Sequence, residues 1–336
     1  VKGGKFLEAV AEADTIVFDK TGTLTKAQPT VAEVVSFSET KSPDELLRIA
    51  ACLEEHFPHS MAKAVVDAAK KRNISHEEMH SKVEYIVAHG ISTTINGHKV
   101  IIGSAHFVFE DEHCVIPEGM EEKFAALPEE YSHLYLAIEG ELAAVICIHD
   151  PIRPEASAVI NSLKRTGISK VVMMTGDSER TAKAVAAQIG VDEYYSEVLP
   201  EDKAGFVERE KAAGRKVIMI GDGINDSPAL SAADVGIAIS DGAEIAREIA
   251  DVTIGADNLY EIVTLKAISN GLMKRIHKNY RSIILVNAGL IALGVTGMIQ
   301  PTTSALLHNT STLVIGLKSM QNLICLLYTS PSPRDS

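Results

Sequence analysis

Three short apolar runs, rich in β-branched residues, alternate along the chain with longer stretches of helical spacing. The runs span residues 15–19, 171–174 and 217–220, and each leads into a turn that contains glycine and aspartate. Continuous apolar runs of this length are typical of parallel strands buried on both faces. Two helical stretches, at 179–189 and 203–213, both lie between the last two runs. This order predicts an α/β fold with a doubly wound parallel sheet, which binds ligands at the carboxyl ends of its strands.

The region between the first two runs has a different pattern. Residues near 43–72 have helical spacing, whereas residues 93–100 alternate, and an Asn-Gly pair within them marks a hairpin turn. We therefore expect an inserted α+β domain at 30–147. Two prolines within 150–154 favour an extended return to the parallel sheet.

A long apolar region near the carboxyl end departs from the pattern of a soluble domain. Residues 282–317 include no Lys, Arg, Asp or Glu, and one membrane helix needs only about 20 apolar residues. Pro301 suits a tight turn between two antiparallel helices. The region therefore predicts a hairpin of two transmembrane helices over 277–324, with a buried soluble hairpin as the alternative. The basic residues before it favour a cytoplasmic location for everything upstream, and they are Lys274, Arg275, Lys278 and Arg281.

The last residues, 325–336, have Ser-Pro repeats that cannot pack, and they resemble translated adapter DNA. We expect them to be a non-native tail. Because the chain also begins at Val1 without an initiator Met, we expect a fragment of a longer protein.

Composition narrows the range of partners. The 336 residues contain 32 Lys and Arg against 45 Asp and Glu, which gives a net charge of −13. Such a charge repels phosphate backbones, so we expect no nucleic-acid partner. The 4 Cys residues lack the spacing of a zinc site and are too few for a disulfide scaffold, which fits a reducing compartment.

The most informative motif begins where the first apolar run ends. Residues 19–25 read Asp-Lys-Thr-Gly-Thr-Leu-Thr, and here the sequence resembles the P-type ATPases, whose phosphorylation motif it matches at every position. A carboxylate at a strand tip can attack the γ-phosphoryl group of ATP when cations neutralise the incoming charge. The resemblance implies that Asp19 is the phosphorylated nucleophile, with Lys20 and Thr21 beside it in the catalytic motif. An aspartate that only caps a helix is the alternative.

The turn after 217–220 supplies further carboxylates. Asp222 and Asp226 are separated there by a glycine-bearing turn, and hard carboxylate oxygens beside a phosphate are what Mg²⁺ prefers. A solvated acidic turn is the alternative. By resemblance to the family, the magnesium site comprises Asp19, Thr21, Asp222, Asn225 and Asp226.

Two other segments match the family near the expected phosphoryl group. Thr175, Gly176 and Asp177 follow the second apolar run, and a hydroxyl with backbone N–H groups at such a junction can hold phosphoryl oxygens. Lys203 resembles the family lysine that offsets negative charge during transfer. Without the surrounding match, it would be an ordinary surface lysine.

Thr21 separates two kinds of enzyme that share this architecture. Hydrolases of this type carry a second aspartate two residues after the nucleophile, as general acid and base, and this chain has Thr21 there. A phosphoenzyme that persists suits coupling to transport. A membrane-anchored phosphohydrolase and a non-enzymatic metal- or nucleotide-binding module remain the alternatives.

The inserted region resembles the nucleotide domain of the heavy-metal branch of the P-type ATPases. The segment 53–64 aligns His59 with the family histidine that contacts adenine, although Ser60 stands where the family has proline. By the same resemblance, Glu54 reaches the adenine amino group, and Gly90 and Gly103 let the backbone approach ATP. A surface histidine and ordinary turn glycines are the alternatives.

The apolar region contains a polar cluster that suggests a cargo. Asn287 lies in its first half, and His308 and Thr312 lie in its second. Intramembrane polar groups often line ion paths, and imidazole favours transition metals, although hydrogen bonding between helices is the alternative. The resemblance implies an ATP-driven pump for a transition-metal cation, preferably divalent, in a bacterial plasma membrane. We expect this chain to be the carboxyl-terminal part of such a pump, without the actuator domain and the upstream membrane helices. The expected parts are a phosphorylation domain (1–29 and 148–276), a nucleotide domain (30–147) and two transmembrane helices (277–324).

Overall fold

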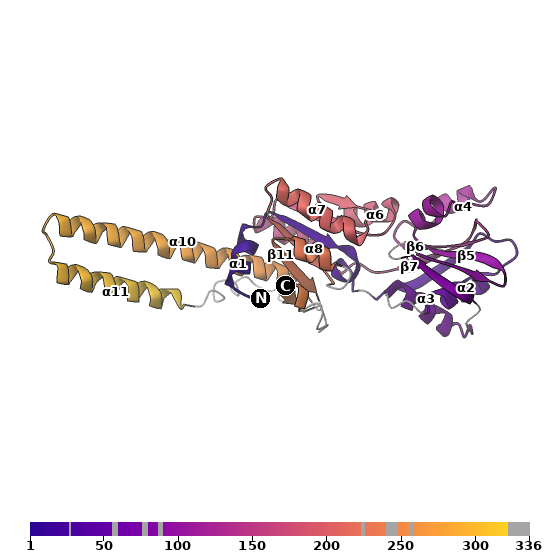
Figure 1. Cartoon of the computed structure of the whole chain (residues 1–336), viewed down its shortest axis with the longest axis horizontal. Coiled ribbons are helices and arrows are strands. Elements are labelled where there is room, and N and C mark those ends of the chain that lie inside the picture. The colour runs from indigo at the N-terminus through magenta and orange to yellow at the C-terminus, as the bar shows by residue number, and fades with distance from the viewer. Residues whose placement is uncertain are drawn as a thin grey trace, which may run out of the picture. The chain divides into compact units, whose positions relative to one another are not determined.

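Two six-stranded sheets and a pair of long helices dominate the computed structural model (Figure 1). The structure describes residues 1–26, 28–55, 60–75, 80–86, 90–222, 226–239, 248–255 and 258–321. The chain divides into two compact units, one made of residues 1–2 and 13–260 and the other of residues 3–12 and 261–336. Both sheets belong to the first unit.

The first sheet is parallel throughout, with the strand order β12-β11-β10-β1-β8-β9. The three predicted strands occupy its centre. The strands in this order are Val252–Ile254, Val235–Ile239, Val217–Gly221, Thr15–Asp19, Lys170–Met174 and Glu193–Tyr195. The predicted doubly wound α/β fold is confirmed.

Helices connect these strands, as the alternating pattern predicts. They are α5 (Ala156–Arg165), α6 (Glu179–Ile189), α7 (Pro200–Ala212) and α8 (Ser227–Ala232). Residues of α7 and α8, including Phe206 and Leu230, pack with Val17, Val172 and Met219 in one buried cluster. Because α7 begins with a proline in its first turn, it starts three residues before the predicted 203–213 helix.

The second sheet is antiparallel, with the strand order β2-β7-β6-β5-β4-β3. In this order the strands are Thr30–Ser36, Glu141–His149, Ser132–Ile138, His98–Gly103, Gly90–Ile95 and His80–Ile86. Asn96 and Gly97 form the predicted hairpin turn, with φ values of 51° and 88°. All six strands lie between β1 and β8 in the chain, so the inserted α+β domain is confirmed.

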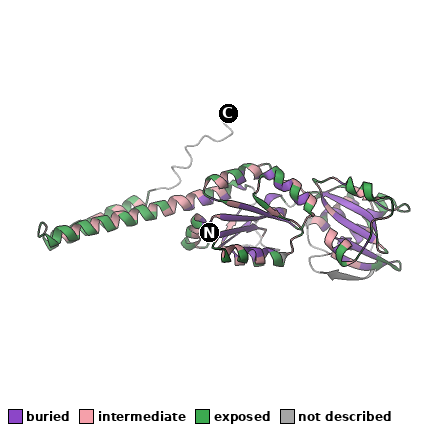
Figure 2. Cartoon of the chain, turned by 90° about the horizontal axis from the view of Figure 1, so that it is seen from above, coloured by how far each residue is buried: buried purple, intermediate pink, exposed green. Residues whose placement is uncertain are grey.

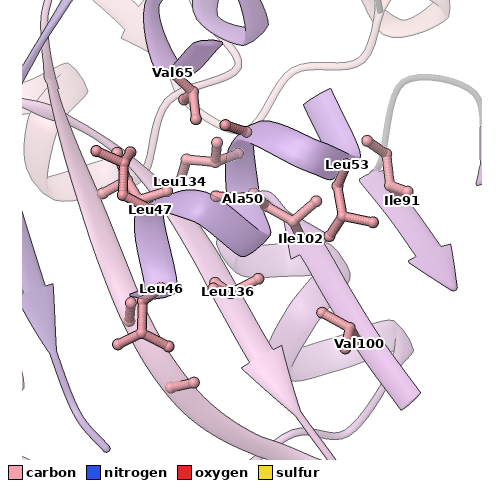
Figure 3. Packing of buried hydrophobic residues seen from close by; sticks show 14 of the residues in the cluster. Leu46, Leu47, Ala50, Leu53, Val65, Ile91, Val100, Ile102, Leu134 and Leu136 are labelled. Carbon is pink, nitrogen blue, oxygen red and sulfur yellow. The ribbon is translucent and has the colours of Figure 1, made fainter. Parts of the chain in front are cut away.

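This inserted sheet is covered on both faces (Figure 2). Along β6, Leu134 and Leu136 face one cluster, while Tyr135 and Ala137 face the other. The first cluster includes α2 (Pro43–Glu54) and α3 (Ser60–Lys71), as Figure 3 shows for α2 residues such as Leu46. The second contacts α4 (Glu121–Ala125) through Phe124. The inserted sheet therefore has an apolar core on each of its faces.

The second unit consists of α1 (Gly4–Glu12), α10 (Tyr260–Val295 apart from its first residue) and α11 (Pro301–Ser319). Lys266 of α10 is buried and donates to the carbonyls of Val10 and Ala11 at 2.8 and 2.9 Å, which caps α1. The amide of Asn279 donates to the hydroxyl of Ser319 at 2.6 Å, so α10 and α11 form the predicted hairpin.

The two helices expected in this region are present. None of the helices in the described ranges has the length and apolar character of a membrane span, and the crossing of a membrane by residues 277–324 stays a prediction.

Candidate active site

The carboxyl edge of the parallel sheet gathers most of the candidate catalytic residues. Asp19 ends β1, Thr175 follows β8, and Asp222 follows β10. Because β1 pairs in parallel with both β8 and β10, these residues emerge at the same edge.

Lys203, in the first turn of α7, bridges two of the carboxylates. Its Nζ lies 2.7 Å from Oδ1 of Asp19 and 2.7 Å from Oδ1 of Asp226. All three residues are buried, with 7%, 7% and 1% of Lys203, Asp19 and Asp226 exposed. Burial alone would lower the pKa of Lys203, but the charges and hydrogen bonds of the two carboxylates raise it above its ordinary value. The ammonium is therefore fixed in its charged form.

Asp19 is an unusually basic aspartate. Burial is the largest cause and the charge of Asp226 the next, and together they raise the pKa of Asp19 to about 7 against the attraction of Lys203. Asp222 raises it further. The pKa of Asp19 is raised in spite of Lys203, so a further cation bound beside Asp19 would favour its ionised form.

Asp226 provides a free acceptor at this point. Its Oδ2 is buried without a hydrogen-bond partner among the described residues, a state that costs free energy. Gly221 makes room for it, because a Cβ at that position would lie 2.3 Å from Oδ2 of Asp226. Because Gly221 has no side chain, Oδ2 of Asp226 can lie against the backbone of that residue.

Lys20 and Asp177 form a second ion pair beside the first. The Lys20 ammonium contacts the Asp177 carboxylate in a buried salt bridge, and it donates to the hydroxyl of Ser132 at 3.1 Å. Thr175 donates to Asp177 at 2.9 Å. Burial opposes ionisation of Asp177, but Lys20 and the hydrogen bonds from Ser132 and Thr175 outweigh it, so the pKa of Asp177 is lowered. Gly176 lies between these residues, and the nearest atom to a Cβ there would be Val198 O, at 4.0 Å.

The loop after Asp19 is held by an arginine that the sequence argument missed. Arg153 is buried, and its Nε donates to the carbonyls of Thr23 and Thr25 at 2.9 and 3.1 Å. The loop departs from helical backbone at Thr21 and at Gly22, where φ is 77°. A buried arginine aimed at two carbonyls fixes the backbone that carries the catalytic motif.

The structure brings together some of the residues expected to bind magnesium. Asp19, Asp222 and Asp226 are neighbours, Thr21 follows two residues after Asp19, and Asn225 lies outside the described residues. Within the described ranges, no group of three or more His, Cys, Asp or Glu side chains is arranged as a metal site. Mg²⁺ usually takes one or two carboxylates and completes its shell with water and phosphate oxygens. The free Oδ2 of Asp226 and the carboxylates of Asp19 and Asp222 fit that donor set.

The candidate nucleotide residues lie on the inserted sheet and its helices. Gly90 and Gly103 are opposite one another in the β4–β5 pairing. A Cβ at Gly90 would lie 2.3 Å from the Phe107 ring and 2.5 Å from the carbonyl of Ile102, so packing alone requires glycine here. Glu54 ends α2 with 3% exposed, and burial raises its pKa to about 7. His59 lies outside the described residues.

The candidate cargo residues meet across the helical hairpin. Nδ1 of His308 lies 2.8 Å from Oδ1 of Asn287. The hydroxyl of Thr312 donates to the His308 carbonyl at 3.0 Å, one turn earlier in its own helix. Histidine and asparagine are therefore brought together, while the Thr312 hydroxyl is bonded to its own backbone.

Sequence reasoning also missed Ser132. It begins β6, far from the catalytic motifs in the chain, and no local pattern marks it. For Arg153, the signal was available: an arginine between two prolines within the predicted return to the parallel sheet.

Comparison with known proteins places this architecture in a family. Residues 13–234 match the family described as haloacid dehalogenase-like hydrolase. The chain therefore belongs to the haloacid dehalogenase-like hydrolases.

Curated relatives have more specific descriptions. The chain is 37% identical over 317 residues to a zinc-exporting P-type ATPase of Mycobacterium marinum, covering 94% of this chain and 43% of the relative. It is 37% identical over 316 residues to a manganese-exporting P-type ATPase of Mycobacterium tuberculosis, with coverage of 94% and 44%. It is 37% identical over 304 residues to a copper-transporting ATPase of Rhizobium meliloti, with coverage of 90% and 36%. The chain thus spans less than half the length of these relatives.

Solved structures agree. A crystal structure of a zinc-transporting PIB-type ATPase matches with a TM-score of 0.63 and 28% identity, over 95% of this chain and 51% of that one. The catalytic domain of a CPx-ATPase matches with a TM-score of 0.63 and 30% identity, over 79% of this chain and 94% of the other. The resemblance to the heavy-metal branch of the P-type ATPases is confirmed.

Proposed function

We propose that this chain is the catalytic part of an ATP-driven heavy-metal pump that works through an aspartyl phosphate on Asp19. The observation that carries the proposal is the buried arrangement in which Lys203 bridges Asp19 and Asp226 at the carboxyl edge of the sheet. A nucleophilic carboxylate needs fixed positive charge beside it to accept a phosphoryl group.

The transfer itself needs few groups. An oxygen of Asp19 attacks the γ-phosphorus of ATP, the bond between that phosphorus and the bridging oxygen breaks, and ADP leaves with the electron pair. Lys203 offsets the charge that develops on the phosphoryl oxygens, and the backbone N–H at Gly176 can donate to them. The Thr175 hydroxyl, which donates to Asp177 in this structure, can donate to a phosphoryl oxygen once it turns away from Asp177. Lys20 and Asp177 hold the loop and the Thr175 turn together.

The proposed cofactor is Mg²⁺, held by Asp19, Asp222 and Asp226, with Asn225 and Thr21 as further members of the site. When bound, it neutralises phosphate charge and favours the ionised form of Asp19. Ionisation matters because the pKa of Asp19 is raised to about 7, and only the carboxylate is nucleophilic.

The proposed nucleotide site is on the inserted sheet, within the domain boundaries 30–147. Glu54 and His59 contact the adenine, and Gly90 with Gly103, where β4 begins and β5 ends, lets the backbone approach ATP. The cross-strand pairing of the two glycines supports their acting together. Residues 1–29 and 148–276 form the phosphorylation domain in the same proposal.

The proposed cargo is a divalent transition-metal cation, and the proposed location is a bacterial plasma membrane with the catalytic domains on the cytoplasmic side. The support is the His308–Asn287 pair, the names of relatives that export zinc or manganese, and the basic residues before Ser282. Fractionation of cells that express the chain, followed by an alkaline carbonate wash, tests the location: a chain recovered entirely in the wash contradicts it.

Acid-quenched labelling with γ-³²P-ATP and Mg²⁺ tests the proposed activity. We expect a label on the chain that hydroxylamine removes and that Asp19→Asn abolishes. Asp14→Asn, at the amino end of the same strand, is the matched control and should label like the unchanged chain. Steady hydrolysis of phosphate esters without a trapped label would indicate a phosphohydrolase instead.

A further inference from the structure

The catalytic loop is tethered directly to the inserted sheet. The Lys20 ammonium, one residue after Asp19, donates to the Ser132 hydroxyl at 3.1 Å, and the Asp177 carboxylate accepts a hydrogen bond from the same hydroxyl. Lys20 and Ser132 are 3% and 5% exposed. One serine of β6 thus joins both partners of the Lys20–Asp177 ion pair.

The backbone before Ser132 is held from the phosphorylation side. Thr181 donates to the carbonyl of Tyr131 at 3.0 Å. Arg180 donates to Oε1 of Glu129 at 2.7 Å and to the carbonyl of Ala125 at 2.8 Å. Because α6 begins just after Asp177, the same turn that carries the ion pair also fixes the segment leading into β6.

We propose that Ser132 is a positioning residue, whose hydroxyl holds Lys20 against Asp177 only while the inserted sheet is seated on the α6 turn. The contact between the inserted sheet and the α6 turn then determines how well the loop that carries Asp19 is held in place. This inference rests on the proposed function, since it assigns Ser132 a role in the same phosphoryl transfer.

The chemistry of a hydroxyl suits this role. It can accept from the ammonium and donate to the carboxylate at the same time, without adding a charge that would compete with either. Alanine would remove one partner from each of two buried charged groups, and such groups are expensive to leave unsatisfied. Threonine keeps the hydroxyl, whereas cysteine keeps the size but is a weak hydrogen-bonding group.

Single-turnover phosphorylation measures the effect. For Ser132→Ala, we expect the rate of phosphoenzyme formation at saturating ATP to fall about tenfold, with less than a twofold change in the ATP concentration that gives half the rate. Ser132→Thr should restore at least half of the rate. If the added methyl group prevents folding, Ser132→Cys is used instead, and we expect it to be phosphorylated at the slow rate of Ser132→Ala. Ser162→Ala is the control, because the Ser162 hydroxyl donates to the Ala158 carbonyl within its own helix.

Amide hydrogen exchange provides a readout that needs no ATP. Ser132→Ala should speed exchange in the Lys20–Leu24 loop and at Gly176 and Asp177, with no change in β10. If the unchanged chain does not label, the proposed function fails, and the exchange result alone decides this inference. Labelling of Ser132→Ala at the unchanged rate, or unchanged exchange in the loop, overturns it while leaving the proposed function in place.

Discussion

Nζ of Lys203 lies 2.7 Å from Oδ1 of Asp19, at the point where α7 begins and β1 ends. The same nitrogen lies 2.7 Å from Asp226, so it serves two buried carboxylates. In the proposed function, a group in this position both stabilises the fold and prepares Asp19 to accept a phosphoryl group, and the two effects can be separated by substitution.

Lys203→Met should reduce phosphoenzyme formation at least a hundredfold, because the charge beside Asp19 is lost. It should also destabilise the chain by about 3 kcal/mol at pH 8, since two buried carboxylates lose their partner. Stability is measured by urea unfolding and activity by labelling. Lys203→Arg, which keeps the charge, should lose less stability than Met, and equal losses in the two variants would contradict the ionic role.

Asp19→Asn should stabilise the chain at pH 8 when Mg²⁺ is removed by a chelator. The folded pKa of Asp19 is about 7 and the unfolded value is 3.8, so the folded chain binds the extra proton between these values. Its contribution to stability therefore falls as the pH rises from about 4 to 7. The expected gain at pH 8 is about 2 kcal/mol, vanishing below pH 4, as measured by unfolding at a series of pH values.

Gly221→Ala should disturb Asp226 without touching the nucleophile. The added Cβ would lie 2.3 Å from Oδ2 of Asp226, so this carboxylate must move. We expect the Mg²⁺ concentration for half-maximal labelling to rise about tenfold or more. Gly205→Ala is the control on α7, where the nearest atom is Arg209 Nη1 at 3.6 Å, and it should be neutral or slightly stabilising.

Arg153→Met should loosen the catalytic loop, because two hydrogen bonds to the carbonyls of Thr23 and Thr25 are lost. We expect a loss of about 2 kcal/mol of stability and a lower labelling rate at saturating ATP. Arg165→Met, at the last residue of α5, is the control. Unchanged amide hydrogen exchange of the loop in Arg153→Met would show that the hydrogen bonds of Arg153 do not hold the loop in place.

Glu54→Gln should raise stability at pH 8 by about 2 kcal/mol, because burial raises the pKa of Glu54 to about 7 and its ionisation is unfavourable in the folded chain. The contribution of Glu54 decreases as the pH rises from about 4.5 to 7. The same variant should bind ATP several-fold more weakly if Glu54 contacts adenine, as measured by calorimetry. Glu55→Gln, at an exposed position, should change neither quantity.

Much of the fold could be predicted because its strands are short apolar runs. The run that ends in Asp19 is buried at every position, and burial on both faces is what removes polar residues from such a strand. The alternation in β6 was harder to recognise, because both faces of the inserted sheet are covered and Leu134 and Tyr135 are both buried. Helix ends also depended on tertiary context, as the early start of α7 at Pro200 shows.

The candidate site residues could be predicted where they lie within short, contiguous sequence motifs. Asp19, Lys203 and Asp226 were all named from local patterns, and the structure places them in contact. Ser132 could not be found this way, because its importance depends on a contact with Lys20 across 112 positions of chain.

The route by which the chain leaves and re-enters the parallel sheet has a consequence for modularity. Thr25 pairs with Ile152 in an antiparallel bridge, and the Arg153 amide donates to the Leu24 carbonyl at 2.8 Å. Outgoing and incoming segments therefore run together as a narrow neck. The segment between Thr25 and Ile152 can therefore change in length, or be exchanged for another domain, without loss of any strand-pairing hydrogen bond in the parallel sheet that contains Asp19.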